Sequence, residues 1–558
     1  MNIDKKKGTV ISLVFCLCLL FCITFLIESH NEVITGDEIV TYSMANNSDG
    51  GFVFSEGRVA GYLKEYVFEN NIAGTVSNLI SEAKDILENR RDARFFTYNP
   101  DPEVRYYSQD EMKDWMEKRD YEKFNIGTTW LHSLSDESNS FFFYSMMNIA
   151  CSLLSPISGT KWSGFILNML IYLLLLFQFY RLTQDMDVSP EQGMLMTLLL
   201  GVTTDVLNRI CYIRAYLFAM VLAVMLVRMH CRLWKLTDTE NDLKTCHFSA
   251  AIPLLLIAVF SHYINVLMIF CLAVVTIVSF YRHGQKESII RYIFVVAVSL
   301  LLSVLIDPFS IAGLFIKFTE TSSSTAVGLL EELSGYFMHS LLPGYLFTGL
   351  LIAFSIALYR KHEKADPVSN IERNLLVSLG LFSAVVIIGT KACRYMTILT
   401  PLYLLVILLL IRRVYLSSSM EKTAKQVLLG FTCILFAVLS IFHSYQSFDV
   451  MNGKYEKIRS AIQPYLNEDC VFLRTRRTGY EYVPDISNFN NCQVITLTTE
   501  NWKDLVSDRI LANNELTLFS VRSSEIAFPL EWFSENGYAV KQLYEDNEIT
   551  IYHASKAV

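Results

Sequence analysis

Two adjacent carboxylates, Asp37 and Glu38, follow the first apolar segment of this 558-residue chain, in the stretch ITGDEIVTYSMAN. A positioned carboxylate can take a proton from a reacting hydroxyl group, and a carboxylate pair can also hold a divalent cation. The same pair can be ordinary loop charge in contact with water. The local sequence does not neutralise the two charges, so their role depends on the other polar residues that the fold brings to them.

Further charged and polar residues border later apolar runs. A charged group at the bilayer centre costs about 2.5–3.5 kcal/mol on insertion scales, so such residues usually face a cavity or a partner. Carboxylates and arginines gathered on one side of a membrane indicate a shared site at its outer edge. The residues are Asp136 and Glu137 before FFFY, Arg209 and Arg214, the triplet Ser261-His262-Tyr263, and the pair Arg394-Tyr395.

Each of these residues also has a purely structural interpretation. An arginine near a helix end often extends its charge to the membrane interface while its stem covers apolar surface. His262 could be a core histidine bonded to a neighbouring helix. Asp136 and Glu137 could cap the helix that follows them.

The composition identifies the class of protein. Hydrophobic residues make up 52% of the chain and charged residues only 18%, against roughly 25% charged residues in soluble proteins. The apolar residues fall in runs of about 17–22, long enough to cross roughly 30 Å of hydrocarbon as helices. We therefore predict a polytopic α-helical membrane protein with about 11–13 spans. After the first span, the candidates are 141–157, 163–181, 190–207, 210–229, 248–262, 263–281, 291–309, 339–359, 373–390, 396–412 and 425–444.

The predicted organisation has four parts. Residues 1–28 form a first transmembrane helix with its N-terminus in the cytoplasm, because lysines precede it. Residues 29–140 form a long, acidic outer loop with a helix near 77–96 along the membrane surface. Residues 141–445 are the multi-span domain, and basic clusters place its short loops in the cytoplasm. If every apolar run crosses the membrane, the sides assigned to the loops conflict with one another. We expect 141–157 to be the segment that is re-entrant or interfacial instead of crossing.

Residues 450–558 read as a small extracytoplasmic α/β domain. The segments DCVFLRT, CQVITLTT, ELTLFSV and EITIYHA have strand character, and AIQPYL, NWKDLVSDRIL and PLEWFSENGY have helical character. Strands that alternate with helices are typical of such a domain. Cys470 and Cys492 could form a disulfide bond there. Most other cysteines lie in apolar runs without metal-binding spacing, and no basic tract suggests nucleic acid as a partner.

The ordered set of motifs resembles the GT-C superfamily of membrane glycosyltransferases, in particular the branch of protein O-mannosyltransferases and bacterial aminoarabinose transferases. The resemblance spans residues 8–445. One family motif, His-Pro-Pro in the second outer loop, is absent, which puts its substrate role in doubt here. The segments that carry the resemblance are Gly36-Asp37-Glu38, Asp136-Glu137-Ser138-Asn139 in place of His-Pro-Pro, Arg214-Ala215-Tyr216, Ser261-His262-Tyr263, and Arg394-Tyr395 through Pro401.

The resemblance implies a hexosyl- or pentosyltransferase that moves a sugar from a polyprenyl-phosphate donor to an extracytoplasmic glycan, lipid or protein. A sugar phosphate has a good leaving group, so one carboxylate can suffice, whereas glycosidases use two. Asp37 would be the general base, with inversion at the anomeric carbon, and Glu38 would orient it or the acceptor. No cofactor is implied, although Asp37 and Glu38 could hold a divalent cation. Arg394, Arg214 and Tyr395 would bind the donor phosphate, and Asp136, Glu137, His262, Tyr263 and Tyr216 would contact substrate.

Two other functions fit the same composition. A transporter or flippase of lipid-linked saccharides would also combine apolar helices with outer charges, but transporters often contain repeated halves, and the sequence shows no internal repeat. A non-catalytic envelope assembly protein would use its large outer regions to bind partners. The combination of Asp37 with Arg394 argues against an assembly protein, and a transporter would not need the long acidic first loop or the C-terminal α/β domain.

Overall fold

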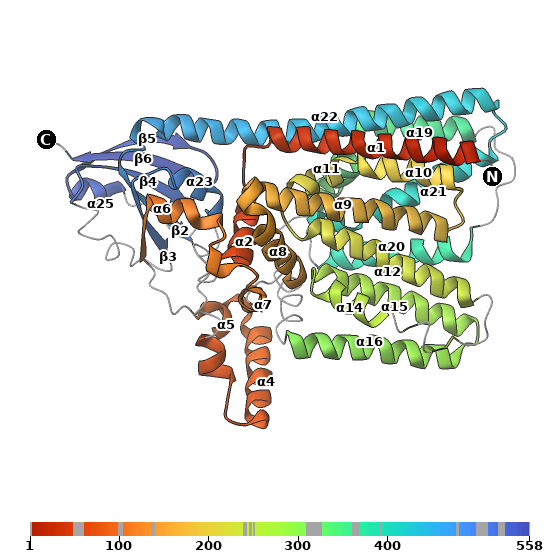
Figure 1. Ribbon diagram of the computed structural model, residues 1–558, viewed down its shortest axis with the longest axis horizontal. Coiled ribbons are helices and arrows are strands. Elements are labelled where there is room, and N and C mark those ends of the chain that lie inside the picture. Colours follow the sequence, from red (N-terminus) through yellow and green to blue (C-terminus); the bar gives the residue numbers. More distant parts are fainter. Residues whose placement is uncertain are drawn as a thin grey trace.

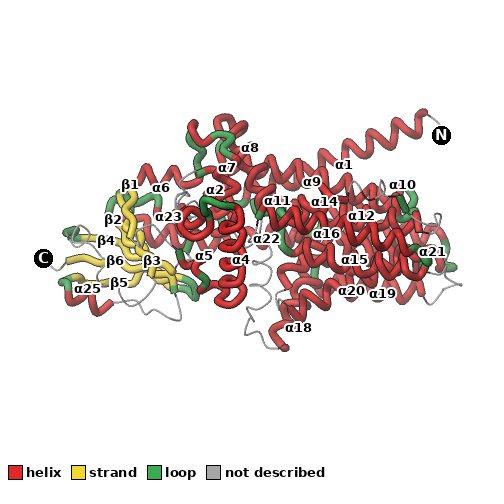
Figure 2. Tube along the Cα trace, turned by 90° about the horizontal axis from the view of Figure 1, so that it is seen from below, coloured by secondary structure: helices red, strands yellow, loops and turns green. Residues whose placement is uncertain are grey.

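The computed structural model describes residues 3–47, 61–98, 104–134, 140–237, 243–244, 248, 251–307, 326–359, 368–389, 393–475, 479–497, 512–522 and 530–556. Long helices lie side by side along the longest axis of the molecule, and a small sheet lies at the end opposite the N-terminus (Figure 1). The strands are confined to that end (Figure 2). The predicted combination of a helical bundle with a C-terminal α/β domain is confirmed.

Within the described residues, seven helices are long and apolar enough to cross a membrane, or up to nine if each of two bent pairs is one span. This confirms a multi-span membrane protein, with fewer long spans than the 11–13 predicted. Two shorter apolar helices, Cys16–His30 and Phe141–Ile157, add to them. The bundle comprises α1 (Ile3–His30), α8 (Phe141–Ser158), α9 (Thr160–Asp185), α10 (Pro190–Gly201), α11 (Thr204–Cys211), α12 (Tyr216–Thr237), α14 (Ala251–Val259), α15 (Ile264–Arg282), α16 (Lys286–Ile306), α18 (Ala326–Gly335), η5 (Tyr336–Leu341), α19 (Tyr345–Tyr359), α20 (Asn370–Gly389), η6 (Cys393–Leu399), α21 (Thr400–Ser417) and α22 (Lys422–Ile462).

The bent pairs account for part of the difference in span number. Helices α10 and α11 meet at 56°, so the predicted span 190–207 is broken, and the next predicted span, 210–229, corresponds to the full-length helix α12. The short α11 is polar on one side, since it carries the buried ion pair of Asp205 and Arg209. A second bend of 77° separates Glu331–Leu341 from Tyr345–Ile356. Chain breaks of this kind at membrane depth occur where protein, not lipid, surrounds the backbone.

The first loop folds into short elements around the sheet end of the bundle. Its longest helix, α4, ends at Asn89, short of the predicted 96, because Arg90 takes a positive φ of 55°. Ile72, Val76 and Ile80 lie one helical turn apart on α4 and are 85%, 48% and 66% exposed. In Figure 1 α4 runs across the direction of the bundle helices, the arrangement expected of a helix along a membrane surface. The elements are α2 (Gly36–Asn46), η1 (Leu63–Val67), α4 (Ile72–Asn89), η2 (Arg90–Asp92), α5 (Arg94–Thr97), β1 (Val104–Ser108), α6 (Gln109–Lys113), η3 (Asp114–Met116), η4 (Asp120–Glu122) and α7 (Ile126–Leu134).

The sheet has six strands in the order β1-β3-β2-β4-β6-β5. The three central strands β3, β2 and β4 are parallel, and the flanking strands pair antiparallel. Four strands were predicted; β5 and β1 were not. The expected helix at 501–511 lies outside the described residues. The elements are η7 (Gln463–Tyr465), β2 (Asp469–Thr475), η8 (Tyr480–Tyr482), α23 (Val483–Ile486), β3 (Asn491–Leu497), β4 (Glu515–Val521), α25 (Leu530–Glu535), β5 (Tyr538–Glu545) and β6 (Ile549–Lys556).

The first loop and the C-terminal domain form one packed unit. Strand β1 comes from the first loop, and Val104 lies opposite Ile495 of β3. Helix α22 is a single helix of 41 residues that leaves the bundle and continues to the sheet. One hydrophobic core contains Ile39 of α2, Ile458 of α22 and Phe519 of β4. Helix α2 is therefore held between the bundle and the sheet, which fixes the position of the acidic pair.

Candidate active site

Glu38 is a buried residue that anchors the N-terminus of α2. Its Oε2 accepts hydrogen bonds from the backbone N–H of Thr35 at 2.8 Å and from the Thr35 hydroxyl at 2.9 Å, which closes a capping box. Its Oε1 accepts a hydrogen bond from the backbone N–H of Ile213 at 3.0 Å. Burial raises the pKa of Glu38, and these hydrogen bonds oppose the shift. The carboxylate thus ties α2 to the segment between α11 and α12.

Asp37 is exposed, unlike its neighbour. Its Oδ2 accepts a hydrogen bond of 2.5 Å from the Tyr212 hydroxyl, contributed by the same segment between α11 and α12. Burial and the Asp37 charge together raise the pKa of Tyr212 well above its ordinary value, so the phenol stays protonated and donates. Asp37 is the member of the pair that a substrate hydroxyl can reach. A cation shared by both would have to displace hydrogen bonds from Glu38, so that prediction stays open.

Arg214, in the segment between α11 and α12, contacts α2 at Thr41, one helical turn after Asp37. Its guanidinium donates to the hydroxyl of Thr41 at 3.2 Å and to the hydroxyl of Tyr144 at 2.9 Å. The bonds connect α2, α8 and the start of α12. A cation is therefore held close to the acidic pair by neutral partners.

A second arginine, Arg209, lies against the tyrosines of the site. Its guanidinium carbon lies 5.5 Å from the ring centre of Tyr212 and 4.8 Å from that of Tyr216. Its Nε donates to Asp205 at 3.3 Å, and Asp205 in turn accepts a 2.6 Å hydrogen bond from Thr400. The buried carboxylate aims this arginine at the tyrosine pair. The sequence marked Arg209 as an outer cation but gave it no role.

A cluster of aromatic rings continues from Tyr216 into the bundle. The His262 ring centre lies 5.4 Å from that of Tyr216, 4.6 Å from Tyr263 and 6.3 Å from Tyr395. Tyr263 and Tyr395 are 5.5 Å apart and meet edge to face. The rings come from α12, from the break before α15, and from η6, three segments far apart in the sequence. They form one aromatic wall beside Asp37 and the two arginines.

The structure thus brings together seven of the predicted site residues, and three lie outside what it describes. The backbone of Arg394 belongs to η6, next to Tyr395, but its side chain lies outside the described part of the chain. Asp136 and Glu137 fall in the undescribed segment 135–139. The predicted phosphate role of Arg394 and the predicted substrate contacts of Asp136 and Glu137 therefore stay predictions.

The C-terminal domain contributes a carboxylate that sequence reasoning missed. A Cβ added to Gly36 would lie 2.8 Å from Oε2 of Glu481, which follows β2 in η8. Burial raises the pKa of Glu481, and the charges of Glu548 and Asp37 raise it further. No local motif marks Glu481, because only the contact between η8 and α2 brings it to the acidic pair.

An apolar groove with a cavity volume of about 100 Å³ lies between α10, α19, α21 and α22. Leu199, Phe347, Leu404 and Phe436 line it, and it extends along α21 to Tyr415. Leu404 is one turn from Thr400, whose hydroxyl binds Asp205 beside Arg209. One end of the groove is therefore one helical turn from the contacts of Arg209, and the other end is lined by Gln192 and Arg412, which hydrogen-bond to each other.

The comparisons with known proteins find similarity among solved structures. No family model and no curated protein matches the chain. Two crystal structures of ArnT from Cupriavidus metallidurans match with a TM-score of 0.48. The one bound to undecaprenyl phosphate is 9% identical and the alignment covers 97% of each chain; the apo form is 10% identical with 98% of each covered. At that TM-score and sequence identity, the similarity does not by itself assign a function to this chain.

Proposed function

We propose that this protein is a membrane glycosyltransferase that moves a sugar from a polyprenyl-phosphate donor to an acceptor hydroxyl outside the cytoplasm, with inversion. One observation carries the proposal: an exposed carboxylate, Asp37, is bonded to Tyr212, against which Arg209 lies, and a second arginine, Arg214, is bonded to Thr41 one helical turn after Asp37. A base and a phosphate-binding pair are the two elements that such a transfer needs.

The proposed chemistry is a single displacement. The acceptor oxygen attacks the anomeric carbon, the bond from that carbon to the phosphate oxygen breaks, and the proton of the acceptor hydroxyl passes to Asp37. The lipid leaves as polyprenyl phosphate, a stable anion. A general base at this position contributes about 10²–10⁴-fold to the rate. Tyr212 supports the role, because its hydroxyl fixes the orientation of the Asp37 carboxylate.

The arginines suit the departing phosphate. A guanidinium meets two phosphate oxygens in a planar fork, and its charge stabilises the negative charge that develops there. Arg209 is held by Asp205 and Arg214 by two hydroxyl groups, so both are oriented before substrate arrives. Arg394 is a third candidate from its position in η6. The tyrosine and histidine rings would supply flat faces for the sugar.

The apolar groove suits the lipid chain of the donor. Most of its lining residues are apolar, and Leu404 in the lining is one helical turn from Thr400, which binds the partner of Arg209. A polyprenyl tail in this groove would leave its phosphate at the arginines. An acidic base would then lie at the membrane edge because one of its two substrates is embedded there.

The test uses cells that lack this protein, complemented with wild type, Asp37→Asn or Asp110→Asn. Asp110 is an exposed acid in α6, away from the arginines, and serves as the matched control. Polyprenyl-phosphate sugars and envelope glycans are measured by mass spectrometry at equal protein levels. We expect one lipid-linked sugar to accumulate and one glycan modification to disappear only with Asp37→Asn. Full complementation by Asp37→Asn would refute the proposal and favour a transporter or an assembly protein.

A further inference from the structure

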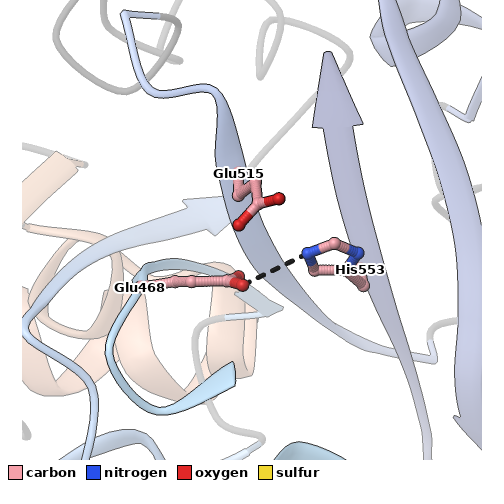
Figure 3. Close-up of side chains that lie close together, drawn as sticks. All are labelled: Glu468, Glu515 and His553. Atoms are coloured by element: carbon pink, nitrogen blue, oxygen red, sulfur yellow. Dashed lines mark hydrogen bonds and ion pairs between the residues drawn. The ribbon is translucent and has the colours of Figure 1, made fainter. Parts of the chain in front are cut away.

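Three side chains that can bind a metal ion lie close together at the amino ends of the parallel strands β2 and β4. Glu468 precedes β2, Glu515 begins β4, and His553 lies on β6. Their ligand atoms all lie within 4.8 Å of one another, and the three side chains point toward a common centre (Figure 3). Thr517 is the register partner of His553, so Glu515, two residues before Thr517, emerges on the same face of the sheet.

The distances suit a metal ion. Around a tetrahedral zinc ion with bonds of about 2.0–2.2 Å, ligand atoms are about 3.3–3.5 Å apart. Nε2 of His553 already lies 3.2 Å from Oε1 of Glu468. Glu515 is exposed, so its side chain can close on an ion that arrives from solvent. A set of one imidazole and two carboxylates is a set that zinc accepts, with a fourth position left for water.

Two ligands are held in place by neighbours. The Thr517 hydroxyl donates to Oε2 of Glu468 at 3.3 Å, which leaves Oε1 directed at His553. The ring of Tyr465 stacks on His553 with 4.3 Å between centres. Partners of this kind orient metal ligands and raise affinity.

The charges of the three side chains also favour a bound cation. Among the described residues, His553 is the only basic side chain in ion-pair contact with Glu468, and Glu515 has no ion pair. Two carboxylates that share one histidine repel each other. A divalent cation would neutralise both carboxylates with the imidazole uncharged.

We propose that Glu468, Glu515 and His553 bind a divalent transition-metal ion, with zinc as the best match, which links the start of β2 to β4 and β6. The site lies at the amino ends of the parallel strands β2 and β4. The segment that touches α2, η8, follows the carboxyl end of β2. The ion would therefore stabilise the C-terminal domain and take no part in sugar transfer.

The test uses the full-length protein in detergent, stripped with a chelator and titrated with zinc alone. Bound zinc is counted by mass spectrometry of the metal, and affinity is measured by calorimetry. We expect about one zinc ion per chain for wild type and for the control Glu535→Gln, an exposed acid on α25. The double variant Glu515→Gln/His553→Gln should bind at least tenfold more weakly. Thr517→Val, which removes an orienting partner, should weaken binding about 10–100-fold.

X-ray absorption at the zinc edge identifies the ligands. We expect a first shell of nitrogen and oxygen only. A shell with sulfur would assign the zinc to some of the twelve cysteines and overturn the proposal. Equal zinc binding by wild type and the double variant would also overturn it, since Glu468 and His553 would then form a simple ion pair.

Discussion

The substitution Glu38→Gln tests whether Glu38 anchors helix α2, as the structure indicates, or takes part in proton transfer. Three hydrogen bonds end on the Glu38 carboxylate, two from Thr35 and one from Ile213. A glutamine side chain has one oxygen. If that oxygen faces Thr35, the amide nitrogen faces the N–H of Ile213, and two donors meet without an acceptor. The loss of a hydrogen bond to a charged group costs about 1.5–3 kcal/mol. The docking of α2 should weaken by that amount.

The consequence for activity follows from the neighbours of Glu38. Asp37 precedes it, and Tyr212, which binds Asp37, precedes Ile213. Loss of the anchor therefore misplaces the proposed base relative to its orienting tyrosine. At about 1.4 kcal/mol per factor of ten, Glu38→Gln should lower kcat/KM by about 10–150-fold. Asp37→Asn removes the base and should lower it by about 10²–10⁴-fold.

The pH dependence distinguishes the two roles. Initial rates are measured from pH 4 to 9, roughly the range in which carboxylates and histidines titrate, with purified variants added to membranes from cells that lack the protein. Those membranes supply donor and acceptor, and the product is measured by mass spectrometry. Glu38→Gln should keep the acidic limb of the profile at a lower rate throughout, and Asp37→Asn should lose that limb. If Glu38→Gln loses the limb and Asp37→Asn keeps it, Glu38 is the base and the reasoning fails.

Three further perturbations follow from contacts around α2. Glu481→Gln removes a negative charge beside the acidic pair, which favours the carboxylate form of the base, so the acidic limb should move to lower pH. Arg209→Lys keeps a charge for its buried partner but loses the planar fork, and should raise KM for the lipid donor about tenfold with kcat little changed. Gly164→Ala adds a methyl group 2.3 Å from the hydroxyl of buried Tyr42 and should destabilise the protein by about 1–3 kcal/mol. Gly349→Ala, with open space around it, is its control in thermal unfolding.

Part of the site could be predicted because its residues stand at the ends of apolar runs. Asp37, Arg214, Tyr216, His262 and Tyr395 each interrupt or border a span, where a polar group is costly unless the fold uses it. Their common side of the membrane was predicted from the basic clusters at the opposite ends of the spans. The structure brings all five to one end of the bundle, although the part of the chain that it describes contains fewer long spans than predicted.

Other features could not be predicted because they depend on pairings far apart in the sequence. Strand β1 pairs with Asn491–Ile495 of β3, close to four hundred residues away, and no local pattern specifies that partner. The polarity of 445–462 suggested that the last span stops at 444. The helix continues because Tyr455, Ile458 and Ile462 recur at helical spacing and pack on the sheet. Glu481 reaches the site only through this arrangement.

The C-terminal domain is part of the machinery that positions Asp37. Helix α2 touches the bundle through Glu38 and Ile213, and touches the domain through Gly36 and Glu481. The domain in turn is joined to the first loop by β1 and to the bundle by the continuous helix α22. Removal of the domain would leave β1 without its partner and the buried core around Ile39 open to water. Asp37, the proposed base, would lose its place even though no residue of the bundle changed, so the domain has a structural role beyond any binding of the acceptor.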